Sequence, residues 1–388
     1  MEYRHATLLR IALANSIGFS ASTAVPLWVG SVGAHFGFPS WGAGAVATAQ
    51  LACAALLNAM TPWLFRRTHL RSLAWMATAV ALLGNGLAWL GSSSAFIVGC
   101  PLAGAGFGVL LNVTNRLVAG SSAPQRGYAI VQLVEVLFCI GFFLSVPPII
   151  VRFGTLSVFA ALAALCVAVF LLLAGVPVGV SGGPETSARK NSGSPPNTAS
   201  AVLSLCAAAL LFSGYSAVGS SLVSIGAAVG VSLLWVGRIM ALGLLASLGG
   251  AVLARGLSER AGVLLPLLAG AGIVGGDMLV VTLGRGAYGF IGGSLLLFMG
   301  MVFLSPYIYT LLAGLDKAGR WASIAPGFVL TGVALGPGIA GVATRGVDFT
   351  TLGVTALTCI VAAMVLFVAA ERLRLRAAPA TEAQPEAI

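Results

Sequence analysis

The chain has 388 residues, of which 59% are hydrophobic and only 8% are charged. Soluble domains carry about 25% charged residues, so this composition excludes a water-exposed globular surface. It predicts an all-α polytopic membrane protein whose surface mostly faces lipid. The formal net charge of +10 would also suit a nucleic-acid partner, so the placement of the basic residues has to decide between the two.

Apolar segments long enough to cross a bilayer follow one another along the chain. A bilayer core about 30 Å thick needs about 20 apolar residues per helix. We predict twelve spans, at residues 9–33, 42–64, 72–91, 95–118, 128–150, 156–178, 200–226, 232–254, 263–284, 288–313, 324–344 and 350–370.

The basic residues fall on alternate connections between these spans. Of the 20 lysines and arginines, only Arg152, Arg238, Arg285 and Arg345 belong to one side, and all the others belong to the side of both termini. This positive-inside pattern predicts cytoplasmic termini and makes the lipid bilayer, not nucleic acid, the partner of the charge. Arginine far outnumbers lysine in an Ala- and Gly-rich chain, which we interpret as a bacterial inner-membrane protein.

A polar stretch divides the chain in two. Residues 179–199 are rich in Gly, Ser and Pro, the composition of a flexible linker. We predict an N-terminal six-helix half at residues 1–178, a cytoplasmic linker at 179–199, a C-terminal six-helix half at 200–376 and a disordered tail at 377–388.

The first predicted helix of each half carries a stripe of hydroxyl side chains at spacings of three and four, which places each stripe on one helix face. The stripes are Ser16, Ser20 and Thr23, and Ser213, Ser216, Ser220 and Ser224. Small hydroxyl residues also serve close helix packing. The presence of both stripes favours a wet central cavity lined by Ser20, Thr23, Ser216 and Ser220.

Glycine and proline motifs follow the same two-fold division. Residues 256–262 contain Glu259-Arg260-Ala261-Gly262, an acidic-Arg-x-Gly turn. Residues 332–341 contain Gly332-x-x-x-Gly336-Pro337, and residues 104–108 form a short glycine run. Glycines let membrane helices approach closely, and proline bends a helix by removing a donor.

With these motifs and this layout, the chain resembles the major facilitator superfamily over nearly its whole length. The resemblance implies two pseudo-symmetric six-helix halves, a solute bound between them and alternating access. It assigns Glu259, Arg260, Gly336 and Pro337 to conformational change. Cys100 stands where many proton-coupled members carry an arginine, which is a departure from that subgroup.

Enzyme motifs lack their structural context. The G-x-G-x-x-G match at Gly270–Gly275 lies inside a predicted span without a preceding strand. His5, His35 and His69 form no zinc motif. We therefore expect a protein that is not an enzyme and has neither a cofactor nor a bound metal.

Ionisable residues within the spans are functional candidates, because burying a charge in the bilayer costs about 2.5–3.5 kcal/mol on insertion scales. Arg238 is a candidate for binding an anionic solute, or it reaches the outer interface. Asp277 lies at a similar depth and is a candidate partner of Arg238, a proton carrier or a structural residue. Glu135, with Asn112 and Arg116 at similar depth, suggests a protonation site, an inner gate or a fixed polar contact between helices.

Gln50 and Tyr307 are weaker candidates for the cavity. The sequence thus predicts a secondary transporter, expected to be monomeric and driven by protons or another coupling ion, that moves a small organic anion. An efflux pump for lipophilic drug-like compounds is the alternative. A sensor or assembly partner on the same fold, without transport, is a further one.

Overall fold

The computed structural model describes residues 5–39, 41–64, 68–121, 124–174, 198–284, 286–313, 320–344 and 348–377. The described residues contain twelve helices, and all twelve are long and apolar enough to cross a membrane. They are α1 (His5–Phe36), α2 (Gly42–Leu64), α3 (Leu70–Trp89), α4 (Ser93–Ala119), α5 (Pro124–Phe153), α6 (Ser157–Ala174), α7 (Thr198–Ala228), α8 (Leu233–Ala261), α9 (Leu264–Leu283), α10 (Ala287–Ala313), α11 (Arg320–Ala343) and α12 (Thr350–Ala377).

The predicted spans are confirmed, and the helices extend beyond several of them. Helix α1 begins four residues before the predicted span, at His5, and α12 continues to Ala377. The extension of α12 carries Glu371, Arg372, Arg374 and Arg376, as expected where a helix leaves the hydrocarbon core. The predicted linker lies almost entirely outside the described residues, and so does the predicted tail, apart from Ala377.

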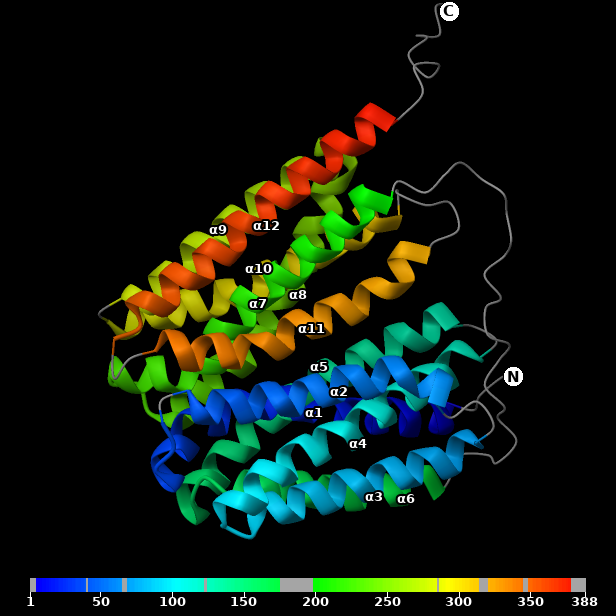
Figure 1. The fold of residues 1–388 in the computed structure, drawn as a ribbon, viewed down its shortest axis with the longest axis vertical. Coiled ribbons are helices and arrows are strands. Elements are labelled where there is room, and N and C mark those ends of the chain that lie inside the picture. The colour runs from blue at the N-terminus through cyan, green and yellow to red at the C-terminus, as the bar shows by residue number, and fades with distance from the viewer. Residues whose placement is uncertain are drawn as a thin grey trace, which may run out of the picture.

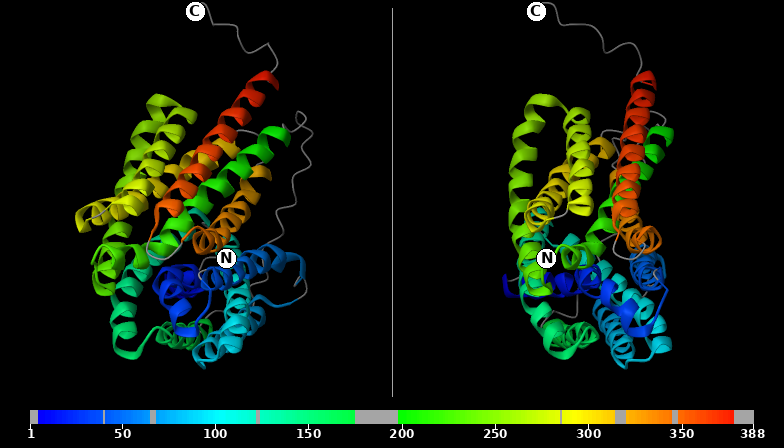
Figure 2. Two further views of the ribbon diagram at one scale, coloured as in Figure 1. Left: turned by 60° about the vertical axis from the view of Figure 1, so that its left-hand side comes forward. Right: turned by 90° about the vertical axis from the view of Figure 1, so that its left-hand side faces the viewer.

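Helices α1–α6 pack mainly on one another, and so do α7–α12 (Figure 1). In the first group α4 contacts α1, α2 and α3, while α6 contacts α1 and α3. In the second group α7 lies beside α11 and α12, as both views of Figure 2 show, and α10 lies beside α8 and α9. The two groups meet through three helix pairs, α2 with α11, α5 with α8 and α1 with α7.

Glycines in the left-handed region end several odd-numbered helices. Gly37, Gly91, Gly154 and Gly230 follow α1, α3, α5 and α7 with φ between 65° and 83°. Residues with a side chain rarely adopt this conformation, so these glycines permit tight turns into the next helix. All four turns lie at the same end of the bundle, which we call the opposite end. The basic end is the one where α1 begins and α12 ends, and it carries Arg10 and Arg372.

The two groups approach each other closely at the opposite end. A Cβ atom on Gly30 of α1 would overlap Ser224 of α7, and one on Gly44 of α2 would overlap the Pro337 carbonyl of α11. A Cβ on Gly237 of α8 would lie 2.5 Å from the Phe143 carbonyl oxygen of α5. Toward the basic end, α2 and α11 diverge (Figure 1). The described conformation is therefore closed at the opposite end.

Candidate functional site

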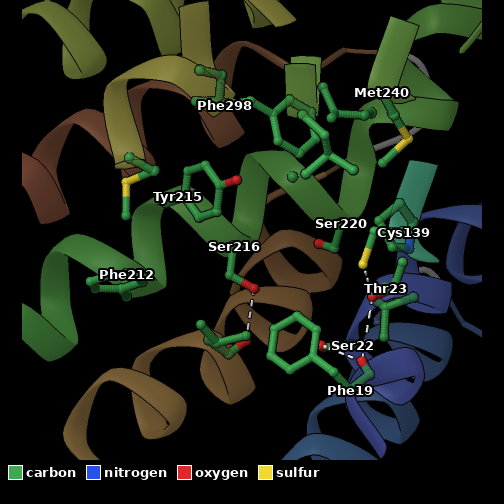
Figure 3. A pocket seen from close by; sticks show the side chains of 18 of the residues that line it. Phe19, Ser22, Thr23, Cys139, Phe212, Tyr215, Ser216, Ser220, Met240 and Phe298 are labelled. Atoms are coloured by element: carbon green, nitrogen blue, oxygen red, sulfur yellow. Dashed lines mark hydrogen bonds between the residues drawn. The ribbon is translucent and has the colours of Figure 1, made fainter. Parts of the chain in front are cut away.

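A cavity of about 330 Å³ lies between the two groups of helices, near the middle of their length. Figure 3 shows side chains of α1, α5, α7, α8 and α10 directed into it. Its described lining residues are Phe19, Ser22, Thr23, Val25, Pro26, Leu51, Cys139, Phe143, Phe212, Tyr215, Ser216, Gly219, Ser220, Leu222, Met240, Leu244, Ser247, Leu297, Phe298, Met301, Val302, Val329, Leu330 and Val333. This volume falls within the range of small-molecule sites.

A smaller space adjoins this cavity on the side of the basic end. The residues that it shares with the cavity are Phe19, Ser22, Leu51, Leu330 and Val333, and those that it adds are Gly18, Ala54, Ala55, Asn58 and Leu111. Of the added residues, Asn58 of α2 and Leu111 of α4 lie toward the basic-end termini of their helices. The larger cavity therefore continues toward the basic end, while close helix contacts close it at the opposite end.

The cavity wall is aromatic and apolar, with a few hydroxyl groups. None of the described residues that line it carries a charged side chain. Ser22 donates to the Phe19 carbonyl at 2.9 Å, Ser220 to Ala217 at 3.0 Å and Ser247 to Leu244 at 2.7 Å. Since these hydrogens are already donated to the backbone, the hydroxyl oxygens face a solute mainly as acceptors.

Ser216 differs from these hydroxyls because it bonds across a helix interface. Its Oγ donates to the Val333 carbonyl of α11 at 2.7 Å (Figure 3). In an uninterrupted helix the N–H of residue 337 would donate a hydrogen bond to that carbonyl, but proline has no N–H. Ser216 thus supplies the donor that Pro337 removes.

Of the residues predicted for solute binding, Thr23, Ser216 and Ser220 line the cavity. Ser20 is fully buried and donates to the Ile17 carbonyl within its own helix. Gln50 is fully buried, and its backbone lies against Gly104 of α4. Tyr307 donates to the Ala254 carbonyl at 2.8 Å and joins α10 to α8. Ser20, Gln50 and Tyr307 pack helices together and are not among the residues that line the cavity.

Arg238 lies outside the cavity as well. Its guanidinium stacks on the ring of Trp235, 4.7 Å from the ring centroid, and both side chains are exposed. No ion pair joins it to Asp277, although the structure describes both residues. An arginine on a tryptophan near a helix end is the arrangement expected at a membrane interface, where the long side chain reaches the headgroups.

Asp277 is buried within the second group of helices, at 5% exposure. It faces α10, because a Cβ on Gly293 would lie 3.1 Å from its Oδ1. It is not among the residues that line the cavity. Its predicted role in coupling stays a prediction.

Glu135 is half-buried on α5, one helical turn from the cavity residue Cys139 toward the basic end. Asn112 donates to the Asn58 carbonyl at 2.9 Å and so joins α4 to α2. No ion pair joins Arg116 to Glu135, and the structure describes both. Among the described residues, no hydrogen bond or ion pair therefore links Glu135 to Asn112 or Arg116.

The motif residues are described unequally. Glu259 and Arg260 lie in the last turn of α8, and their side chains are outside the described residues. Gly336 and Pro337 lie in α11, where a Cβ on Gly336 would overlap Ser216. The Gly-Pro motif therefore sits where α11 meets both α7 and α2.

Sequence reasoning missed most of the wall, including Phe19, Phe143, Phe212, Tyr215 and Phe298. Aromatic residues occur in this wall and also on exposed faces of the bundle, as at Trp63 and Trp89, so aromatic content does not separate the cavity from the lipid. Ser22 was missed because the hydroxyl stripe led to Ser20, which points into the helix bundle. For Tyr215 there was one signal in the sequence, its position next to Ser216 of the second stripe.

Solved structures of transporters share this fold. A mutant of the peptide transporter POT matches with a TM-score of 0.75 at 14% identity, over 95% of this chain and 94% of that one. The POT family transporter PepTSo matches with 0.73 at 13% identity, over 97% and 99%. A mutant of the nucleoside transporter NupG matches with 0.71 at 12% identity, over 95% and 99%.

No family model matches the sequence, and no curated protein matches it either. At these identities the structural likeness shows the fold alone. It confirms the expected twelve-helix fold of the major facilitator type in a multi-pass membrane protein.

Proposed function

We propose that this protein is a secondary transporter that moves a small, largely apolar organic solute across the membrane by alternating access. The observation that carries the proposal is the cavity between the two groups of helices, closed at one end and continued toward the other. Transporters of this fold bind their solute near the midplane between two halves. The proposed location is a bacterial inner membrane with the basic end in the cytoplasm.

The character of the wall supports the lipophilic solute over the organic anion. An anion would need a cationic partner, and the candidate Arg238 lies on Trp235, outside the cavity. Aromatic rings and methionines such as Met240 and Met301 suit a planar apolar body. The hydroxyl oxygens, acting as acceptors, suit one or two donor groups on that body.

A thermal-shift screen of the purified protein tests the solute class. We expect neutral aromatic compounds with N–H or O–H groups to stabilise both the parent protein and Arg238→Ala. A ligand at about a hundred times its Kd adds about 2.7 kcal/mol, which is measurable as a rise in Tm. Stabilisation by carboxylates in the parent protein alone would instead identify an anion carrier that depends on Arg238.

Filling the cavity tests its location. Gly219 lines the cavity, and a Cβ there would meet no atom within 4 Å. We expect Gly219→Leu to fold and to abolish both ligand stabilisation and flux in proteoliposomes. Gly272→Leu is the matched control, since Gly272 is exposed on α9 with equally open space. Binding without flux in the parent protein would favour the sensor alternative.

Glu135 is our proposed site of proton coupling, because it lies one turn below the cavity wall. We expect Glu135→Gln to remove the pH dependence of flux while ligand stabilisation persists. Asp277→Asn is the comparison, since Asp277 lies away from the cavity. If pH dependence survives in Glu135→Gln and is lost in Asp277→Asn, the proton site is Asp277 and Glu135 is a structural contact.

A further inference from the structure

The segment of α11 around Pro337 connects the cavity wall with the closed end. On the cavity side, Val333 lines the cavity and its carbonyl receives the Ser216 hydroxyl at 2.7 Å. Toward the opposite end, the Gly338 N–H donates to Thr48 Oγ1 of α2 at 2.8 Å. Residues 333–338 therefore carry one bond within the second group of helices and one bond between the two groups.

Close packing leaves little freedom around this segment. A Cβ on Gly336 would overlap Ser216, and one on Gly44 would overlap the Pro337 carbonyl. Helix α11 is thus in near-backbone contact with α7 on one side and with α2 on the other. A change in the path of α11 at Pro337 must also displace α2, because close-packed helix interfaces contain too little empty space for one helix to move alone.

We propose that Ser216 is a positioning residue that holds the opposite end closed. Its hydroxyl donates a hydrogen bond to the Val333 carbonyl, which Pro337 leaves without a backbone donor. Without this donor the partly buried Val333 carbonyl is unpaired, which disfavours the path that α11 takes in this structure. The bond from Gly338 to Thr48 depends on that path. Because Ser216 also faces the solute, the inference rests on the proposed function for its role in transport.

A double-mutant cycle tests the inference without any solute. Ser31 and Ala227 are exposed near the opposite end of α1 and α7. With the native cysteines replaced by alanine, except Cys139, which is buried and is kept for its contact with Thr23, spin labels at Ser31→Cys and Ala227→Cys report the distance across this end in pulsed electron-paramagnetic-resonance experiments. We expect Ser216→Ala to raise the ratio of open to closed molecules about 5-fold to 30-fold, the effect of leaving one partly buried carbonyl without a donor.

The background variant Pro337→Ala makes the test specific. This substitution restores the N–H that fills the Val333 carbonyl, so Ser216→Ala should have no further effect in that background. Thr48→Val, which removes the acceptor of the Gly338 N–H, should raise the open population in the parent protein. Ser213→Ala is the matched control, because the Ser213 hydroxyl donates to Ala209 within α7 at 2.8 Å.

An equal effect of Ser216→Ala in the parent protein and in the Pro337→Ala background would overturn the inference, and so would no effect in the parent protein. Since no solute is present, these outcomes are separate from those of the ligand screen and the flux assay. If the protein shows no flux but the double-mutant cycle gives the expected result, Ser216 still holds the opposite end closed. Only the proposal that this closure serves transport would then be wrong.

Discussion

Of the three helix pairs that join the halves, α2–α11 and α5–α8 occupy equivalent places in the two groups but differ in their contacts. Helix α2 packs on α11, and α8 packs on α5, so the second helix of each group meets the fifth helix of the other. In both pairs a glycine near the start of the second helix, Gly44 or Gly237, lies against a fifth helix that contains proline. Each proline leaves a carbonyl of its own helix without a donor.

The difference lies in what meets the free carbonyl. In α11 the Val333 carbonyl receives a hydroxyl, and the residue after the proline, Gly338, donates its N–H to Thr48. In α5 the Phe143 carbonyl faces Gly237, and the residue after Pro147 is a second proline, which has no N–H to donate. One hydrogen bond therefore crosses the α2–α11 interface, and a second bond, from α7, pairs the free carbonyl of α11. The described contact of α5 with α8 at this end is one of shape. We infer that the α5–α8 interface slides more easily.

Leucine at the two glycines is expected to have the largest effect, because it breaks both interfaces alike. In Gly44→Leu and Gly237→Leu the new side chain would occupy the space of the facing backbone. We expect the ratio of open to closed molecules to rise about 5-fold to 160-fold in each, since overpacking costs about 1–3 kcal/mol. The spin-label distance from Ser31 to Ala227 measures this.

Gly86→Leu is the control for this pair, because a Cβ on Gly86 of α3 meets no atom within 4 Å. If either glycine variant closes as the parent protein does, that interface does not determine closure.

Gly336→Ala is expected to have an intermediate effect that sharpens the comparison. The added methyl group overlaps Ser216, so it should separate α7 from α11 and break the bond to Val333. We expect a lower Tm in detergent and a partly opened opposite end. Gly327→Ala lies on the same helix with open space around it and should keep the parent Tm. If Gly336→Ala has the same Tm and the same closed population as the parent protein, the contact between α7 and α11 has room for the added methyl group.

Thr23→Val is expected to have the smallest effect. Helix α1 meets α5 as α7 meets α11, but the polar contact there is Thr23 Oγ1 to Cys139 Sγ at 3.6 Å. A thiol is a weak hydrogen-bonding partner. We expect the ratio of open to closed molecules to change less than about twofold, far less than in Ser216→Ala. A comparable effect in the two variants would mean that these two contacts, one within each half, contribute equally to closure.

How well the sequence predicts the position of a side chain depends on how far that position is set by neighbouring helices. The two hydroxyl stripes were identified by helical spacing alone. In the second stripe the spacing led to Ser216 and Ser220, which line the cavity, whereas in the first Ser20 points into the helix bundle and Ser22 faces the cavity. Spacing establishes which residues share a face, but it does not establish what that face meets.

Arg238 shows the same limit for charge. The sequence places it within the eighth span, but whether it faces a cavity or the membrane interface depends on how α8 is rotated against α5 and α10. In the structure its side chain lies on Trp235. Lipid tails are as apolar as leucine, so hydrophobicity does not separate the lipid-facing side of a helix from a side that lines an apolar cavity.

The number of helices, their approximate ends and the alternation of basic connections could all be read from the amino-acid order. These features follow from the bilayer thickness and from local charge, both of which act on one segment at a time. The identity of the cavity residues, and the bond by which Ser216 fills the carbonyl freed by Pro337, required the packed molecule. Those contacts join residues more than a hundred positions apart, and they exist because α7 and α11 pack at one particular rotation.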